Sequence, residues 1–180
     1  MKIITGKYRG RVLATPDGLN TRPTTGKIKE SIFNIIQFDI EGRDVLDLFA
    51  GSGQMGLEAL SRGAKSCVFC DTDRKALKAI GDNVAKCKAE RECRVYNRDG
   101  LSFLSTAGKN SFGLIFLDPP YAAKLMDEAI KIIISVDILQ DGGIILCESG
   151  KDWSAPELTE PYRVVREYDY GTTKITTITK

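Results

Sequence analysis

The sequence predicts a doubly wound α/β domain, in which helices cover both faces of a mostly parallel sheet. From residue 43 onward, short and almost continuous apolar runs alternate with segments of helical periodicity. Such runs indicate strands that are buried on both faces, and right-handed connections place the intervening helices on the two sides. With 180 residues, of which 42% are hydrophobic, the chain is long enough for one such domain.

Seven strands are expected from this pattern. They are predicted at residues 44–48, 67–70, 94–96, 112–117, 143–147, 162–170 and 174–178. Helices are predicted around residues 57–60, from 73 to about 86, from 101, and from about 124 to 135. The last two strands flank Gly171-Thr172, a two-residue turn, so the final strand should be antiparallel. One face of the sixth strand should carry Tyr162, Val164, Tyr168 and Tyr170.

A small hairpin and a helix are expected ahead of this body. Residues 2–4 and 11–13 are short strands around Gly6 and Gly10, and a loop with two prolines leads to a helix that starts at Thr24 or Thr25. The apolar face of this helix is predicted to hold Ile28, Ile32, Ile35 and Ile36, and the polar side to hold Lys29, Glu30, Asn34 and Gln37. We therefore divide the chain into an N-terminal arm, residues 1–22, and an α/β domain, residues 23–180.

Charge is distributed unevenly along the chain, although the net charge is only +2. Residues 1–30 hold seven basic and two acidic side chains, whereas the remaining 150 residues hold 19 basic and 22 acidic ones. A basic arm on a mildly acidic body is typical of a protein that binds a polyanion. A solvated surface hairpin is the alternative interpretation.

Composition removes several classes of chemistry. The chain has no histidine, which excludes Ser-His-Asp and Cys-His nucleophiles and metal sites that need imidazole. The five cysteines lack a repeated metal-ligand spacing, and Cys67 and Cys70 should point to opposite faces of one strand. They are expected to be core cysteines in a reducing compartment. No apolar run reaches membrane-spanning length and no signal peptide is evident, so a cytoplasmic protein without a metal is expected.

A glycine-rich turn follows the first strand of the body. Asp47-Leu48-Phe49-Ala50-Gly51-Ser52-Gly53-Gln54-Met55-Gly56 leads from a strand into a helix and contains the pattern Gly-x-Gly-x-x-Gly. Glycines at this junction let the backbone approach a ligand closely. Asp71 ends the second strand, where a carboxylate can accept hydrogen bonds from ribose hydroxyls. A nucleoside-containing cofactor is predicted, either NAD or S-adenosylmethionine.

The end of the fourth strand favours S-adenosylmethionine. Asp118-Pro119-Pro120-Tyr121 stands there, at the edge of the sheet that borders the ligand crevice in this architecture. Prolines lack an amide hydrogen, so the carboxylate of Asp118 and the carbonyl of Pro119 can serve as hydrogen-bond acceptors, and Tyr121 adds a flat ring. Two acceptors and a ring suit the exocyclic amino group of a nucleobase. Hydride transfer has no evident use for them.

These motifs together resemble a known family of enzymes. The glycine-rich turn and Asp-Pro-Pro-Tyr look like those of amino-group methyltransferases, and the N-terminal part is similar to the bacterial 16S ribosomal RNA guanine-N2 methyltransferases of the RsmD type. That likeness rests on residues 3–11, 21–25 and 29–34 and runs from about residue 2 to 121. It implies a Rossmann-like class I methyltransferase sheet of seven strands, the last antiparallel, flanked by helices and extended by the N-terminal hairpin.

The resemblance also implies a cofactor, a substrate and a mechanism. A guanine of small-subunit ribosomal RNA, either naked or in an assembled particle, would leave its stack and lie against Tyr121. Asp118 and the Pro119 carbonyl would accept hydrogen bonds from the two N–H groups of N2 and so localise its lone pair towards the methyl group of S-adenosylmethionine. The cofactor would be held by Asp47, Phe49, Gly51, Gly53, Asp71 and Asp99. RNA phosphates would be bound by Lys7, Arg9, Arg11 and Arg22.

Three other functions are compatible with parts of the pattern. The same acceptors would serve an adenine-N6 methyltransferase that acts on DNA or RNA. The glycine-rich turn alone would suit a NAD-dependent oxidoreductase, and the fold alone a non-catalytic RNA-binding protein. The sequence leaves the oligomeric state open, and a monomer is compatible with it. Asp99 can also be explained as the N-cap of the following helix.

Overall fold

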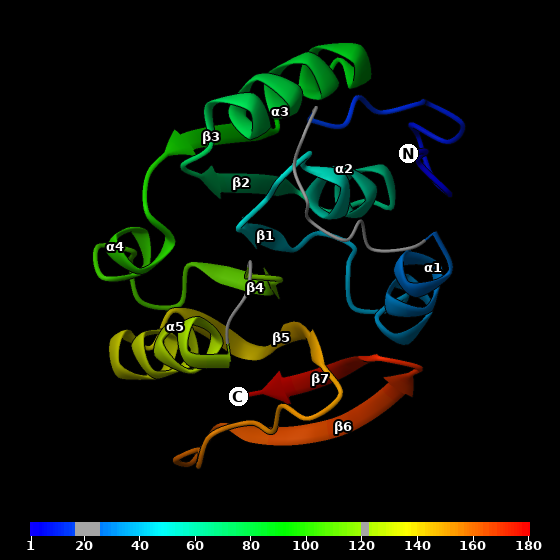
Figure 1. Ribbon diagram of the computed structural model, residues 1–180. Helices are drawn as coiled ribbons and strands as arrows, with labels where there is room; N and C mark the ends of the chain where they lie inside the picture. Colours follow the sequence, from blue (N-terminus) through cyan, green and yellow to red (C-terminus); the bar gives the residue numbers. More distant parts are fainter. Residues whose placement is uncertain (17–25, 120–122) are drawn as a thin grey trace.

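A single seven-stranded sheet forms the centre of the molecule. The computed structural model describes residues 1–16, 26–119 and 123–180 (Figure 1). The strands are ordered β3-β2-β1-β4-β5-β7-β6. Their bounds are β1 Asp44–Leu48, β2 Ser66–Asp71, β3 Cys93–Asn97, β4 Phe112–Leu117, β5 Leu139–Gly150, β6 Arg163–Tyr170 and β7 Thr173–Thr179. Strands β1 to β5 are parallel, and β7 is antiparallel to both β5 and β6. The predicted seven strands and antiparallel last strand are confirmed.

Five helices cover the two faces of the sheet in the described residues, as predicted. Figure 1 shows α1 (Gly26–Ile35), α2 (Gln54–Ser61) and α3 (Arg74–Cys87) on one face, which we call the α2 face. The other, the α5 face, carries α4 (Gly100–Leu104) and α5 (Ala123–Val136). Alternate strand residues enter separate cores: Phe116 packs on the α2 face and Leu117 on the α5 face. Cys67 and Cys70 are divided between these cores in the same way, which confirms that their thiols diverge.

The sixth strand differs from the prediction that its tyrosines share a face. Tyr162 packs in the core of the α5 face, whereas Tyr168 and Tyr170 pack against the core of the α2 face. A bulge between Val164 and Arg166 is the cause, because one extra residue reverses the alternation that follows it. The expectation of one shared face was therefore wrong.

The N-terminal hairpin is present as a short antiparallel pairing. Lys2 and Val12 form an isolated bridge, and the amide of Ile3 donates to the carbonyl of Arg11 at 3.0 Å. Ile3, Tyr8 and Leu13 are buried in the core of the α2 face. The hairpin is thus packed on the sheet domain. The expected start of the first helix at Thr24 or Thr25 lies outside the described residues, which resume at Gly26.

Lys29 corrects the prediction for α1, because it is buried and not on the polar side. Its side chain is 1% exposed, and its Nζ lies 2.9 Å from Oε2 of the fully buried Glu58 in α2. The same carboxylate accepts hydrogen bonds from the amides of Ile4 and Thr5 and from Nε of Arg62. A buried ionic cluster therefore joins the hairpin, α1 and α2.

Candidate active site

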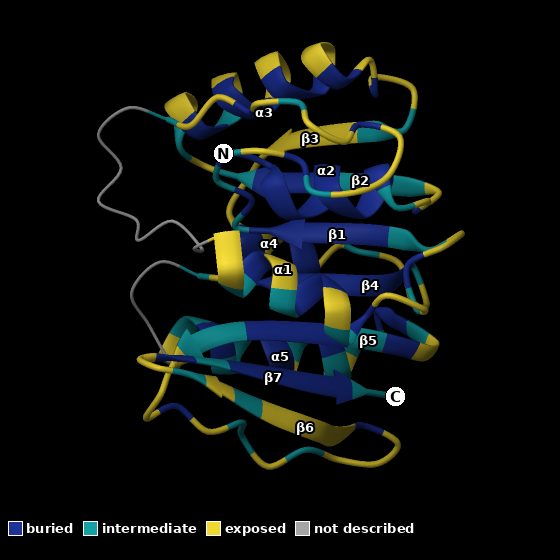
Figure 2. Ribbon diagram, turned by 90° about the vertical axis from the view of Figure 1, so that its right-hand side faces the viewer, coloured by how far each residue is buried: buried dark blue, intermediate teal, exposed yellow. Residues whose placement is uncertain are grey.

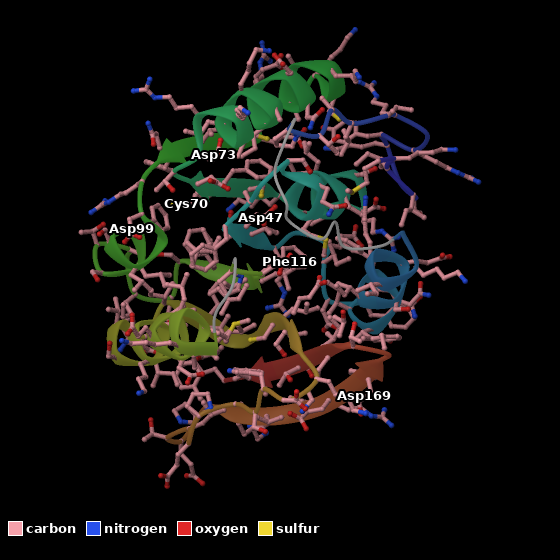
Figure 3. All side chains as sticks on the ribbon, in the orientation of Figure 1. Asp47, Cys70, Asp73, Asp99, Phe116 and Asp169 are labelled. Carbon is pink, nitrogen blue, oxygen red and sulfur yellow. The ribbon has the colours of Figure 1, made fainter. Side chains whose placement is uncertain are left out.

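Acidic side chains gather where the parallel strands end. Asp47 lies in β1, Asp118 follows β4, and Glu148 lies in β5 beside the pair formed by Leu117 and Cys147. Strand alternation directs Asp47 and Glu148 to the α2 face, and Asp118 continues the alternation of β4 to the same side. Figure 3 shows Asp47 next to Phe116, its partner in the strand pairing. The strand order reverses between β1 and β4, and in open α/β sheets ligands bind at that point.

The glycine-rich turn has the conformation that its composition predicts. Gly51 and Gly53 have φ values of 56° and 72°, in the left-handed region that favours glycine. A Cβ added at Gly51 would meet no atom within 4 Å, so the space beside this backbone is open. Phe49 also has a positive φ, of 67°, which is uncommon for an aromatic residue. The turn therefore leaves room for a ligand beside Gly51, at the carboxyl end of β1.

Asp47 is buried at the start of this turn. Its Oδ2 accepts a hydrogen bond of 2.9 Å from the amide of Gly56, which holds the turn against the strand. The pKa of Asp47 is raised to about 7: burial is the main cause, the charge of Asp71 adds to it, and the Gly56 hydrogen bond opposes it. A cation placed beside Asp47 would favour its ionised form.

Gln54 is a residue that the sequence analysis did not single out. It is the first residue of α2, it is buried, and its Oε1 has no hydrogen-bond partner in the described part of the chain. An unpartnered buried acceptor is costly. It therefore marks a position at which a ligand donor fits. Its signal in the sequence was its place inside the glycine pattern, directly after Gly53.

Asp71 connects the end of β2 to the turn. Its Oδ2 accepts from the amide of Gly51 at 2.8 Å, and its Oδ1 accepts from the amide of Asp73 at 2.9 Å. Each carboxylate oxygen has a further lone pair, and the residue is only half-buried, so it can still accept from a ligand hydroxyl. Its role towards ribose stays a prediction.

Asp99 and Phe49 lie together beside the start of α4. Asp99 is the N-cap of that helix, since its Oδ1 accepts from the amide of Ser102 at 2.9 Å (labelled in Figure 3). The ring of Phe49 borders Gly100, where a Cβ would come within 2.8 Å of Phe49 Cε1. The capping interpretation of Asp99 is confirmed, and its contact with adenine stays a prediction.

Asp118 and Pro119 follow β4, and Tyr121 lies outside the described residues, as does Pro120. The side chain of Asp118 is accessible to water, although the protein surrounds it on several sides. Partial dehydration by that protein, together with the negative charges of Glu148 and Asp47, raises the pKa of Asp118 to about 8. Glu148 was missed by the sequence analysis. Its signal was a carboxylate directly after the buried strand predicted at 143–147.

In the described part of the basic arm, residues 1–16, the structure brings no basic side chain to this acidic group. Lys7 forms an ion pair of 2.6 Å with Glu92, the residue before β3, so the tip of the hairpin lies at the amino end of that strand. Arg11 donates to the carbonyl of Lys86, and Arg9 is exposed. Arg22 lies outside the described residues. Their contact with RNA stays a prediction.

No metal site is found in the parts of the chain that the structure describes. Nowhere in residues 1–16, 26–119 and 123–180 do three or more histidine, cysteine, aspartate or glutamate side chains come together in a way that could hold an ion. Within the same residues, no helix has both the length and the apolar character needed to cross a bilayer.

The third glycine of the turn allows a matched pair of stability measurements. A Cβ at Gly56 would lie 2.4 Å from both Cys67 Sγ and Phe69 Cε1, so Gly56→Ala overpacks the core and should lose about 1–3 kcal/mol. Gly81 lies in α3 with open space around it, and Gly81→Ala should gain roughly 0.5–1 kcal/mol. Urea unfolding measures both. Equal stability of Gly56→Ala and the wild type would contradict the close packing of α2 on β2.

Sheet order, glycine turn and the position of Asp118 define a Rossmann-like class I methyltransferase fold. Over residues 1–179 the chain matches the model of the family described as conserved hypothetical protein 95, and it belongs to that family. It is 36% identical over 167 residues to "Ribosomal RNA small subunit methyltransferase D" of Escherichia coli (strain K12), covering 93% of this chain and 83% of that protein. The solved structure of the Escherichia coli yhhF protein has a TM-score of 0.89 and 32% identity, covering 99% of this chain and 96% of that one. The resemblance to the RsmD type is thus confirmed.

Proposed function

We propose that the protein transfers a methyl group from S-adenosylmethionine to the N2 amino group of a guanine in small-subunit ribosomal RNA. The observation that carries the proposal is the position of Asp118 and Pro119, whose acceptors follow β4 beside the glycine turn of β1. The name of the Escherichia coli relative supports ribosomal RNA as the substrate. On this proposal the protein works in the cytoplasm, where ribosomes are assembled.

The residues around the turn fit S-adenosylmethionine. The open space at Gly51 admits a ligand, and the unpartnered Oε1 of Gln54 suits a ligand donor. Asp47 would bind the amino group of the methionine part, and Asp71 the ribose hydroxyls. Phe49 and Asp99 would border the adenine. A protein with this fold, the 16S rRNA N2 G1207 methyltransferase of Thermus thermophilus, has been solved with AdoMet and guanosine, at 16% identity and a TM-score of 0.66.

The chain's own groups would act on the amino group of the target base. When bound, the cofactor supplies a methyl group on a positively charged sulfur. N2 of guanine is a poor nucleophile because its lone pair is delocalised into the ring. Asp118 and the Pro119 carbonyl would accept hydrogen bonds from the two N–H groups of N2, which localises the lone pair on the nitrogen. N2 would take the methyl group while the leaving sulfur keeps the C–S electron pair, and Asp118 or water would take up the proton that N2 then releases.

Incubation with methyl-labelled S-adenosylmethionine tests this function. Small-subunit particles from cells that lack the enzyme serve as substrate in one reaction and naked ribosomal RNA from the same cells in a second, and nuclease digestion identifies the labelled nucleoside. Label in N2-methylguanosine is expected. Label in an adenine would retain the use of Asp118 and overturn the guanine assignment, whereas label in naked ribosomal RNA would identify the unassembled molecule as the substrate.

A further inference from the structure

The α5 face of the sheet is incompletely covered at β2 and β3. A parallel sheet normally has helices over both faces, but α4 contains only five residues. A hollow of about 370 Å³ remains between these strands and the segment after α4. β3 is the edge strand, and Figure 2 shows most of it exposed. This surface is separate from the acidic group around Asp118.

Three side chains form a row along the hollow. Arg94, Tyr96 and Arg98 occupy alternate positions, so all three point to the same side of the edge strand, and all three are exposed. Neighbouring contacts fix two of them. The Tyr96 ring lies 5.3 Å from the ring of Phe103, and Nη1 of Arg98 donates to Oγ1 of Thr106 at 2.8 Å. The described residues that line the hollow include these two arginines and no acidic residue.

The chemistry of this row matches single-stranded nucleic acid. Guanidinium groups bind phosphate oxygens through paired hydrogen bonds, and an exposed aromatic ring provides a stacking surface for an unpaired base. Along a strand, Arg94 and Arg98 are about 13 Å apart, which leaves room for one base over Tyr96 between two phosphate contacts. An acidic protein segment would use the arginines but would leave the ring without a specific partner.

The position of the row supports the same ligand. Arg98 directly precedes Asp99, at the carboxyl end of β3, and Arg94 lies near the amino end, where Lys7 of the hairpin contacts Glu92. The row therefore runs along the edge strand from the proposed catalytic end of the sheet towards the basic hairpin. An RNA strand that follows β3 would contact both the catalytic end of the sheet and the hairpin, which lie at opposite ends of the strands.

We propose that Arg94, Tyr96 and Arg98 bind a single-stranded segment of the substrate RNA, with phosphates on the two arginines and a base on the tyrosine. This site rests on the proposed function for the identity of its RNA, but its binding can be measured without methyl transfer. Bound RNA would lie against the exposed edge strand and continue past Arg98 to the carboxyl ends of the strands, the end of the sheet at which Asp118 lies.

Binding of a fluorescent single-stranded RNA oligonucleotide, measured at several salt concentrations, tests the site. The double variant R94Q/R98Q should weaken binding at least tenfold, and the slope of log K against log salt should fall by about 1.4, the value for two phosphate contacts. Tyr96→Leu should weaken binding with little change in that slope. Arg166→Gln is the matched control, because Arg166 lies beside Tyr168 on the opposite edge strand, and it should bind as the wild type.

Two further measurements separate this site from a folding effect and from the proposed function. Thr106→Val removes the hydrogen bond that Arg98 donates but leaves the charge of Arg98 in place. The slope of log K against log salt should therefore stay at the wild-type value. Affinity for S-adenosylmethionine should be unchanged in all variants. Wild-type affinity and slope in R94Q/R98Q, or an equal loss in Arg166→Gln, would overturn the site. A wild-type protein that binds RNA through this row but forms no N2-methylguanosine would overturn the proposed function alone.

Discussion

Asp118→Ala is expected to lower the rate of methyl transfer by a factor of roughly ten to a hundred or more. On the proposed mechanism, Asp118 accepts a hydrogen bond from N2, and that bond strengthens as positive charge develops on the nitrogen. Loss of a hydrogen bond to a charged group costs roughly 1.5–3 kcal/mol, and each 1.36 kcal/mol of barrier is tenfold in rate. Single-turnover kinetics at saturating RNA and S-adenosylmethionine measures the effect. Near wild-type turnover would contradict this role of Asp118.

The pH dependence of the same reaction gives a sharper test. Asp118 accepts best when ionised, and its pKa is raised to about 8 before the cofactor binds; the sulfonium charge of bound S-adenosylmethionine lowers it, so kcat/KM for RNA should increase with pH to a midpoint below about 8. Saturating cofactor keeps the titration of Asp47 out of the profile. Glu148→Gln removes a nearby negative charge, which should lower the pKa of Asp118 and move the midpoint to lower pH. Asp118→Asn retains an acceptor oxygen but cannot ionise, so its profile should lack this step. An unmoved midpoint in Glu148→Gln would show that another group titrates.

The parts of the site that the sequence predicts are those set by local order along the chain. Gly51 and Gly53 adopt the left-handed backbone that their composition suggests, and Asp71 lies at the end of its strand. The same reasoning applied to the fifth strand would also have identified Glu148, since a carboxylate follows that buried run directly. The separation of Lys7 from Asp118 could not be predicted from the local sequence, because it depends on where the hairpin packs on the sheet.

Lys29 shows how a local pattern can mislead. The buried positions of α1 are Lys29, Ile32 and Phe33, followed by Ile36 just after the helix, at helical spacing. Counting isoleucines selected a neighbouring face through Ile28 and left the lysine on the polar side. A lysine at a core position needs a buried acid, and Glu58 is 29 residues away in another helix. That partner follows only from the tertiary structure.

This buried pair is expected to control stability more strongly than any exposed ion pair. Glu58→Gln leaves the Lys29 ammonium without its counter-ion in the core and should destabilise the protein by about 3–5 kcal/mol. Asp82→Asn, which breaks the exposed pair between Lys78 and Asp82, should lower the stability far less, because solvent screens an exposed ion pair. Urea unfolding of both variants gives the comparison. A loss in Glu58→Gln as small as that in Asp82→Asn would contradict the buried position of the pair.

The sign of the pH dependence identifies the charge on Glu58 as the source of this stability. Burial alone would raise the pKa of Glu58, but hydrogen bonds from the Ile4 amide, Lys29 and Arg62 outweigh it and lower that pKa below its ordinary value. The folded state therefore binds the Glu58 proton less readily than the unfolded state. The stabilisation is present above the unfolded pKa and is lost as the pH falls through the folded pKa. The difference between wild type and Glu58→Gln should accordingly shrink in acid.

Removal of both charges separates the pair from the packing around it. Lys29→Met combined with Glu58→Gln leaves no unpaired ammonium, and the glutamine oxygen can still accept from the amide of Ile4 or Thr5. The double variant should be more stable than Glu58→Gln alone, because most of the cost of the single change is the uncompensated charge. Hydrogen exchange at the Ile4 and Thr5 amides would report whether the hairpin stays packed on α2. The single variant Lys29→Met completes the cycle, and strictly additive losses of stability across it would mean that Lys29 and Glu58 act independently.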